Sequence, residues 1–316
     1  MTGRSTVAAV AAERYGPPAV LQAVDVPAPQ PGRGEVAIAV KAAAVNAIDW
    51  LSRAGKGVTI PSFPAILGWD VAGRIIATGS DAAGLRVGDD VFGLLRFPQL
   101  GQAYAEVVVA PAADVAAIPT GLSYRDVAGS MVLLTAWAAM VTHARVQSGQ
   151  RVLVHGAAGG VGHIAVQIAS DAGAEVIGTA SARNRDFLAG LGATDVADYR
   201  SSHLLDEVGP VDIVMDTRGG EDFFRLVSIV RPGGVIVTLK GQAEGQDVAI
   251  RSARIRAEYV YVSPSRVGLE AISPLLAAGR VALNIDQTFQ LSDVALAHSI
   301  GERGHVRGLL ALEFDR

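Results

Sequence analysis

The chain has 316 residues, half of them apolar, with a formal net charge of −4, 6 histidines and no cysteine. This length is enough for two lobes that each bury a core, and the charge offers no basic excess for nucleic acid. The absence of cysteine excludes disulfides and cysteine-ligated zinc, so we expect no metal site.

Two apolar stretches resemble targeting or membrane segments. The apolar core of the first, residues 7–12, is short for a signal peptide, and we interpret it as a first strand. The second, residues 127–142, has 16 uncharged residues, fewer than the about 20 that a helix needs to cross a bilayer. We interpret it as a buried helix and expect a cytoplasmic protein that does not enter the membrane.

The first part of the chain, to about residue 118, consists of short β-branched segments separated by Gly and Pro. Such segments predict a small antiparallel barrel or sandwich. The main segments are 35–45, 70–79, 88–95 and 104–110.

From about residue 120 strand-like and helix-like segments alternate. This alternation predicts a doubly wound parallel sheet. The expected strands are 151–155, 174–180, 194–199, 211–217, 235–241 and 258–262. After residue 263 we expect a helix over 269–279 and an apolar last strand, 309–314, which can return to the first lobe.

A glycine-rich turn follows the first strand of this sheet. The G-x-G-x-x-G code of dinucleotide-binding turns falls on residues 157–162, with alanine in its first position. Gly159 lets the backbone approach a pyrophosphate, and Gly162 lets the helix pack closely on the strand. The expected contacts with the cofactor are Ala158, Gly159, Gly160, Val161 and Gly162. The alternative is a tight connection that binds nothing.

The end of the second strand indicates which dinucleotide is bound. An acidic residue here would accept the ribose 2′-hydroxyl of NADH, but this chain has Ser181 and Arg183 and no acid before Asp186. A small residue followed by a guanidinium suits a 2′-phosphate, so we expect NADPH. The alternative for Arg183 is an exposed helix residue with a free side chain.

Several separated motifs together resemble one family. They are NAID at 46–49, FPAILGWDVAGRI at 63–75, VGDDVFG at 87–93, LLTAWAAM at 133–140, VHGAAGGVG at 154–162, LGATDVADY at 191–199, RPGGVIV at 231–237 and GHVRG at 304–308. Their order resembles the medium-chain dehydrogenase/reductase superfamily, and most closely its zinc-free quinone oxidoreductase branch. The resemblance implies a GroES-like β-barrel lobe over 1–118 and 263–316, and a Rossmann NADPH-binding lobe over 119–262.

Two positions decide the chemistry that this resemblance implies. In the zinc alcohol dehydrogenases of the superfamily a cysteine stands where this chain has Asn46, and a histidine where it has Trp69. Neither residue is a good zinc ligand, so no Lewis acid is expected to polarise an alcohol or a carbonyl. The reaction left to NADPH is hydride delivery to a quinone or to an α,β-unsaturated carbonyl.

The resemblance also implies roles for single residues. Asn46 and Thr135 are expected to border the nicotinamide, with Thr135 opening a helix beside the ring, and Tyr199 is expected near the adenosine phosphate. The other expected cofactor contacts are Asp216, Leu239, Gly241 and Arg307. The expected substrate pocket is formed by Ile48, Trp50, Leu51 and Trp69, although both tryptophans can equally be core residues of the first lobe.

The phenolic proton donors of related enzymes are missing, because Leu51 and Gly57 occupy their positions. A hydroquinone or an enolate can take its proton from water, so reduction of an activated acceptor remains the expected activity. One alternative is a dedicated enoyl reductase of a polyketide or secondary-metabolite pathway. Another is an NADPH-binding redox sensor without turnover. The segment EYVYV, residues 258–262, resembles the pairing edge of the family, so we expect a homodimer.

Overall fold

The computed structural model describes residues 5–220, 222–240 and 245–314. The chain forms two compact units. Unit 1 comprises Met1–Leu134, Ser263–Ala278 and Leu283–Arg316, and unit 2 comprises Thr135–Val262 and Gly279–Ala282. The first division therefore lies inside helix α2 (Ser130–Trp137), 16 residues beyond the expected boundary at residue 118.

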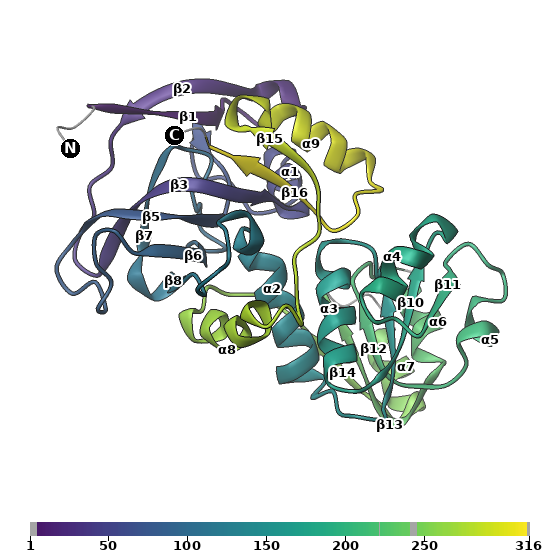
Figure 1. Cartoon of the computed structure of the whole chain (residues 1–316). Coiled ribbons are helices and arrows are strands. Elements are labelled where there is room, and N and C mark those ends of the chain that lie inside the picture. Colours follow the sequence, from purple (N-terminus) through teal and green to yellow (C-terminus); the bar gives the residue numbers. More distant parts are fainter. Residues whose placement is uncertain (1–4, 221, 241–244, 315–316) are drawn as a thin grey trace. The chain divides into compact units, whose positions relative to one another are not determined.

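Unit 2 is built on one six-stranded parallel sheet (Figure 1). Its strands, in the order in which they lie side by side, are β11 (Asp195–Asp198), β10 (Glu175–Ala180), β9 (Arg151–His155), β12 (Val211–Asp216), β13 (Val230–Thr238) and β14 (Arg256–Tyr259). The helices between them are α3 (Gly160–Asp171), α4 (Arg185–Gly190), α5 (Leu204–Val208), α6 (Asp222–Val227) and α7 (Gln246–Ala253). The chain winds outward from β9 in both directions, which confirms the doubly wound sheet.

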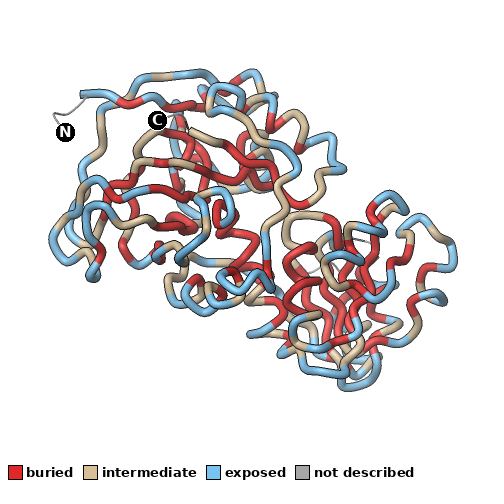
Figure 2. Tube along the Cα trace, viewed as in Figure 1, coloured by how far each residue is buried: buried red, intermediate tan, exposed pale blue. Residues whose placement is uncertain are grey.

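The central strands of this sheet form the core of unit 2. Figure 2 shows them as a buried layer, and Val152, Leu153 and Val154 of β9 are fully buried. A strand covered on both faces is expected to carry consecutive apolar residues, as residues 152–154 do here.

Unit 1 contains two mostly antiparallel sheets. The smaller sheet joins β2 (Leu21–Pro27), β1 (Thr6–Ala12) and β4 (Ala65–Ile66). The larger one joins β15 (Ile285–Gln290), β16 (Leu309–Glu313), β3 (Glu35–Val45), β5 (Asp70–Thr78), β6 (Asp90–Leu94) and β8 (Val115–Ala117), and β7 (Val107–Pro111) pairs with β3. The helices of unit 1 include α1 (Ala47–Arg53), α8 (Arg266–Ala277) and α9 (Val294–Arg303). The late strand β16 pairs antiparallel with β3, so the expected return to the first lobe is confirmed.

Two expected elements differ from the observed ones. The helix expected over 127–142 is divided into α2 and a π-helical segment, Ala138–His143. The strand expected over 258–262 lies earlier, as β14, so Tyr261 follows the strand. Among the described residues, no helix is long and apolar enough to span a bilayer.

Candidate cofactor and catalytic sites

The glycine-rich turn of unit 2 connects β9 to α3 as the sequence predicts. Gly156 has a left-handed φ of +79°, and Gly159 lies at the N-cap of α3. A Cβ on Gly162 would lie 2.3 Å from the carbonyl oxygen of Gly156, so the helix packs directly on the turn. A Cβ on Gly159 would find its nearest atom 3.5 Å away, so this side of the turn is open. The first amides of a helix have no partners within it, and together with the open turn they fit a pyrophosphate.

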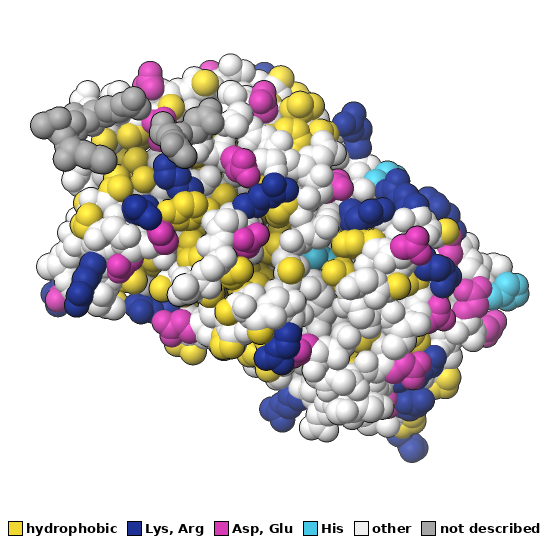
Figure 3. Space-filling model, in the orientation of Figure 1, with side chains coloured by type: hydrophobic (Ala, Val, Ile, Leu, Met, Phe, Trp, Pro, Cys, Tyr) yellow, Lys and Arg dark blue, Asp and Glu magenta, His cyan; other side chains and the backbone are white. Residues whose placement is uncertain are grey.

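The residues at the end of β10 are basic or polar. Ser181 is half-buried, and Arg183 is exposed in the short 3-10 helix Ala182–Asn184 that follows. Figure 3 shows Lys and Arg side chains gathered over this end of unit 2, near α4. Tyr199, one residue beyond β11, exposes 36% of its surface at the same edge of the sheet. Exposed cations and an exposed ring at the carboxyl edge suit a phosphate and a purine.

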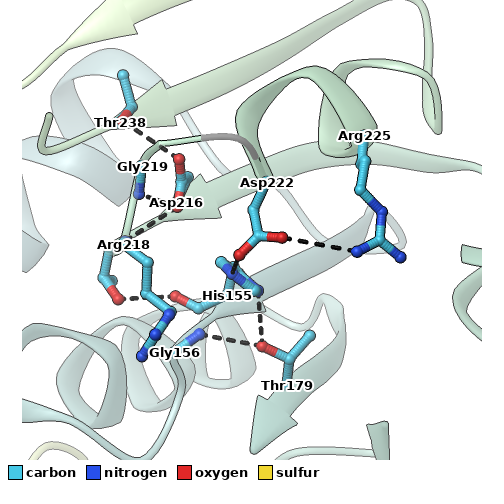
Figure 4. Close-up of polar contacts among 10 residues, drawn as sticks. His155, Gly156, Thr179, Asp216, Arg218, Gly219, Asp222, Arg225 and Thr238 are labelled. Atoms are coloured by element: carbon cyan, nitrogen blue, oxygen red, sulfur yellow. Dashed lines mark hydrogen bonds and ion pairs between the residues drawn. The ribbon is translucent and has the colours of Figure 1, made fainter. Parts of the chain in front are cut away.

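His155, the last residue of β9, links three elements (Figure 4). Its Nδ1 lies 2.8 Å from Thr179 Oγ1, which also accepts the amide of Gly156 at 3.0 Å. Its Nε2 lies 3.3 Å from Asp222 Oδ2 on α6. Burial lowers the pKa of His155 in spite of the nearby carboxylates of Asp216 and Asp222. A neutral His155 therefore holds the start of the glycine turn against β10, a role that the motif alone did not reveal.

Asp216, at the end of β12, is fully buried and engaged in its own loop. Its Oδ1 accepts the amides of Arg218 and Gly219, each at 2.9 Å, and Thr238 Oγ1 donates to its Oδ2 at 3.4 Å. The carboxylate thus shapes the loop beyond β12 and ties it to β13.

Of three other expected cofactor contacts, two lie within the described residues. Leu239 is half-buried and its amide donates to the carbonyl of Asp216 at 3.1 Å. Gly241 lies outside the described residues. Arg307 belongs to unit 1, where its carbonyl accepts Asn284 Nδ2 at 2.7 Å.

In unit 1, Asn46 lies at the N-cap of α1 and is only 5% exposed. Its Nδ2 donates to Asp70 Oδ2 at 2.8 Å, and its backbone amide donates to Asp49 Oδ2 at 2.6 Å. Asp70 Oδ1 accepts the amide of Met131, in the first turn of α2, at 2.7 Å. A single buried carboxylate therefore holds both Asn46 and the start of α2.

A buried polar network surrounds this bond. Burial raises the pKa of Asp49 to about 7 and that of Asp70 well above its ordinary value. The hydroxyl of Tyr104 lies beside Asp49 and 3.0 Å from His298 Nε2. Among the described residues, Asp49 Oδ1, His298 Nδ1 and two nitrogens of Arg53 are buried without a hydrogen-bond partner. No sequence pattern reveals this network, because its members come from four separate segments.

Thr135 is 6% exposed and is the sixth residue of α2. The family resemblance implied that Thr135 is the first residue of a helix, and this expectation is wrong. The helix begins five residues earlier, where Asp70 accepts the amide of Met131 at 2.7 Å. This carboxylate, on β5, satisfies one of the amides in the first turn that have no partner within the helix.

The expected substrate-pocket residues divide into two groups. Ile48 and Leu51 are half-buried on α1. Trp69 is fully buried, and its Nε1 donates to the carbonyl of Gln99 at 2.5 Å, so it belongs to the core of unit 1 and not to an open pocket. Trp50 is partly buried and its ring packs edge-on against His298.

Within residues 5–220, 222–240 and 245–314, no group of three or more His, Asp or Glu side chains lies close enough together to hold a metal ion. The donor set at Asn46 and Trp69 is an amide and an indole N–H, neither of which suits zinc.

Comparison with known proteins gives matches to both parts of the chain. Residues 32–120 match the family described as alcohol dehydrogenase GroES-like domain, and residues 191–312 match that described as zinc-binding dehydrogenase. Human mitochondrial NAD(P)H oxidoreductase RTN4IP1 is 30% identical over 87% of this chain and 80% of that protein. Other curated relatives are longer, and the chain spans about half of their length, 52–54%.

Solved structures match along nearly the whole chain. A quinone oxidoreductase from Coxiella burnetii has a TM-score of 0.90 and 34% identity, covering 98% of this chain and 99% of that one. Escherichia coli quinone oxidoreductase, solved in complex with NADPH, has a TM-score of 0.88 and 26% identity, covering 97% and 99%.

Proposed function

Because this chain belongs to the medium-chain dehydrogenase/reductase superfamily, and there to the quinone oxidoreductase branch, we propose that it is an NADPH-dependent, zinc-free reductase of quinones or α,β-unsaturated carbonyls. The observation that carries this proposal is the turn between β9 and α3. Its closely packed Gly162 and open Gly159 give the turn the form that a pyrophosphate requires.

NADPH, when bound, supplies a hydride from nicotinamide C4, which together with one proton converts a quinone to a hydroquinone or an enone to a saturated carbonyl compound. The chain contributes binding and orientation. The amides at the start of α3 would hold the pyrophosphate, and the residues at the ends of β12 and β13, such as Asp216 and Leu239, would border the nicotinamide half. We assign Asn46 and Thr135 to the reacting end, and water as the source of the proton.

The preference for NADPH is supported by the end of β10. A dinucleotide site for NADH places a carboxylate there for the ribose 2′-hydroxyl, whereas this chain has Ser181 and Arg183. The E. coli quinone oxidoreductase was also solved with NADPH. Replacing Arg183 with Ala is expected to raise the dissociation constant of NADPH more than that of NADH.

Zinc independence follows from the donor chemistry of unit 1. Asn46 directs its Nδ2 donor at Asp70, and the indole of Trp69 donates to a backbone carbonyl. Neither group offers zinc an anionic sulfur or an imidazole nitrogen. Activity is therefore expected to survive incubation with a chelator, and loss of activity that added zinc restores would contradict this part of the proposal.

The proposal is tested with the purified full chain and a panel of acceptors. NADPH and NADH oxidation would be followed with ortho-quinones, para-quinones, simple enones and enoyl thioesters. Turnover of quinones or simple enones above the rate in buffer supports the proposed activity. Turnover of enoyl thioesters alone would favour a dedicated enoyl reductase. NADPH binding without oxidation by any acceptor would favour a redox sensor.

A further inference from the structure

The side chain of Arg218 extends across the carboxyl edge of the sheet in unit 2. Arg218 follows β12, and a Cβ built on Gly156 would lie 3.3 Å from its Cγ, so its aliphatic stem passes over the glycine turn. Its guanidinium carbon lies 5.9 Å from the centre of the Tyr199 ring, beyond β11. Because β9 and β10 separate these two strands, the side chain spans the ends of both.

A second arginine lies against the same ring. The guanidinium carbon of Arg200 is 5.0 Å from the centre of Tyr199, within the range of a cation–π contact. The carboxylate of Asp198 accepts the backbone amide of Arg200 at 2.9 Å. In the part of the chain that the structure describes, neither Arg200 nor Arg218 forms an ion pair with a carboxylate.

Two guanidinium groups on one exposed ring repel each other unless an anion lies between them. Arginine binds phosphate oxygens through paired hydrogen bonds, and a phosphate monoester is close to a dianion at neutral pH. This cluster stands at the strand ends next to β10, where the fold places the ribose 2′-position of a dinucleotide. The free face of the Tyr199 ring can also pack against a purine.

We propose that Arg218, which follows β12, determines cofactor specificity by binding the adenosine 2′-phosphate together with Arg200 and the ring of Tyr199. This inference rests on the proposed use of NADPH. It adds to Arg183 a cation from a different strand, which the strand-end rule for NADPH sites does not single out. It also leaves the aliphatic stem of Arg218 lying over Gly156 in the glycine turn.

The test separates the phosphate from the rest of the cofactor. Adenosine 2′,5′-bisphosphate and adenosine 5′-monophosphate would be titrated calorimetrically into the wild type and into Arg218→Ala and Arg218→Lys, and NADPH and NADH into the wild type. The control is Arg231→Ala, which removes the same charge from unit 2 but at a residue paired with Asp212 at 2.8 Å. Loss of charge-assisted hydrogen bonds should weaken the bisphosphate about tenfold or more in Arg218→Ala.

The expected pattern has three parts. Arg218→Ala weakens the bisphosphate but changes the monophosphate less than about twofold, Arg218→Lys lies between Ala and wild type, and Arg231→Ala changes neither. Equal weakening of both ligands by Arg218→Ala, or no weakening of either, would overturn the role of Arg218. A wild type that binds neither NADPH nor NADH would instead overturn the proposed function itself. A wild type that prefers the bisphosphate, with an unaltered Arg218→Ala, would leave that function standing and reject Arg218 alone.

Discussion

Asn46 and Asp70 form a buried hydrogen bond, 2.8 Å from Nδ2 to Oδ2, that fixes which end of the Asn46 amide is used inside unit 1. The nitrogen faces the carboxylate, so the carbonyl oxygen is the end that this bond leaves available. The same carboxylate accepts the amide of Met131 at 2.7 Å. Asp70 therefore acts on Asn46 as a positioning residue.

We expect Asp70→Asn to lower kcat for a quinone about tenfold, because one oxygen cannot accept both donors and the Asn46 amide loses its fixed orientation. The dissociation constant of NADPH, measured by fluorescence titration, should change less than about twofold. Asp114→Asn is the matched control, since Asp114 is also buried in unit 1 and accepts the amide of Arg96 at 2.8 Å. Equal losses of kcat in the two variants would remove the special role of Asp70.

The glycine turn allows a paired test of binding against stability. Gly159→Ala places a methyl group in the open side of the turn, so NADPH should bind about tenfold or more weakly while the melting temperature stays within about 2 °C. Gly162→Ala places its Cβ 2.3 Å from a backbone oxygen, so the fold itself should be destabilised. Thermal melts and NADPH titrations of both variants check this. A stable Gly162→Ala with wild-type affinity would contradict the packing described here.

Asp49 should make stability depend on pH. Its pKa is about 7 in the folded chain and near 3.8 when unfolded, so the folded state binds the proton more tightly. This contribution is fully present below about pH 4 and is lost as the pH rises towards 7. Asp49→Asn should therefore gain stability relative to wild type between these values, seen as a rising difference in urea midpoint. Asp25→Asn, at an exposed carboxyl, serves as the control and should show a constant difference.

Among the described residues, β14 is an edge strand of the sheet in unit 2 and has no strand paired on its outer side. Tyr259, the last residue of β14, is 45% exposed, and Tyr261, just beyond the strand, is 58% exposed. We propose a homodimer through it, because the unpaired backbone groups of an edge strand can pair with another copy. Sedimentation should show a dimer at micromolar concentration that Tyr259→Lys/Tyr261→Lys converts to monomer, whereas Val248→Lys on α7 does not. A wild-type monomer would reject the proposal.

The sequence allowed the fold to be predicted because both lobes follow local patterns. The run from 152 to 154 is apolar and becomes part of the buried centre of the sheet, and Gly159 and Gly162 stand where the turn requires them. The segment 309–314 could be assigned to the first lobe because an apolar strand after a completed sheet must find another partner.

The candidate site was predicted less completely, because its geometry depends on contacts between distant segments. Asp70 accepts the amide of Met131 in the first turn of α2, 61 residues later, and no spacing along the chain reveals this contact. Trp69 was assigned to a pocket, but its indole bonds to Gln99, 30 residues later. Arg218 was overlooked because its importance lies in its reach to Tyr199 and not in any spacing along the chain.

Because β16 pairs with β3, the sheets of the two units can be completed at different times during synthesis of the chain. Every strand of the sheet in unit 2 lies between residues 151 and 259, so a ribosome can release that sheet as one continuous segment. The larger sheet of unit 1 waits for residues 309–313, although β3 is made more than 260 residues earlier. We therefore expect the cofactor lobe to fold first, and the lobe begun at the N-terminus to be completed last.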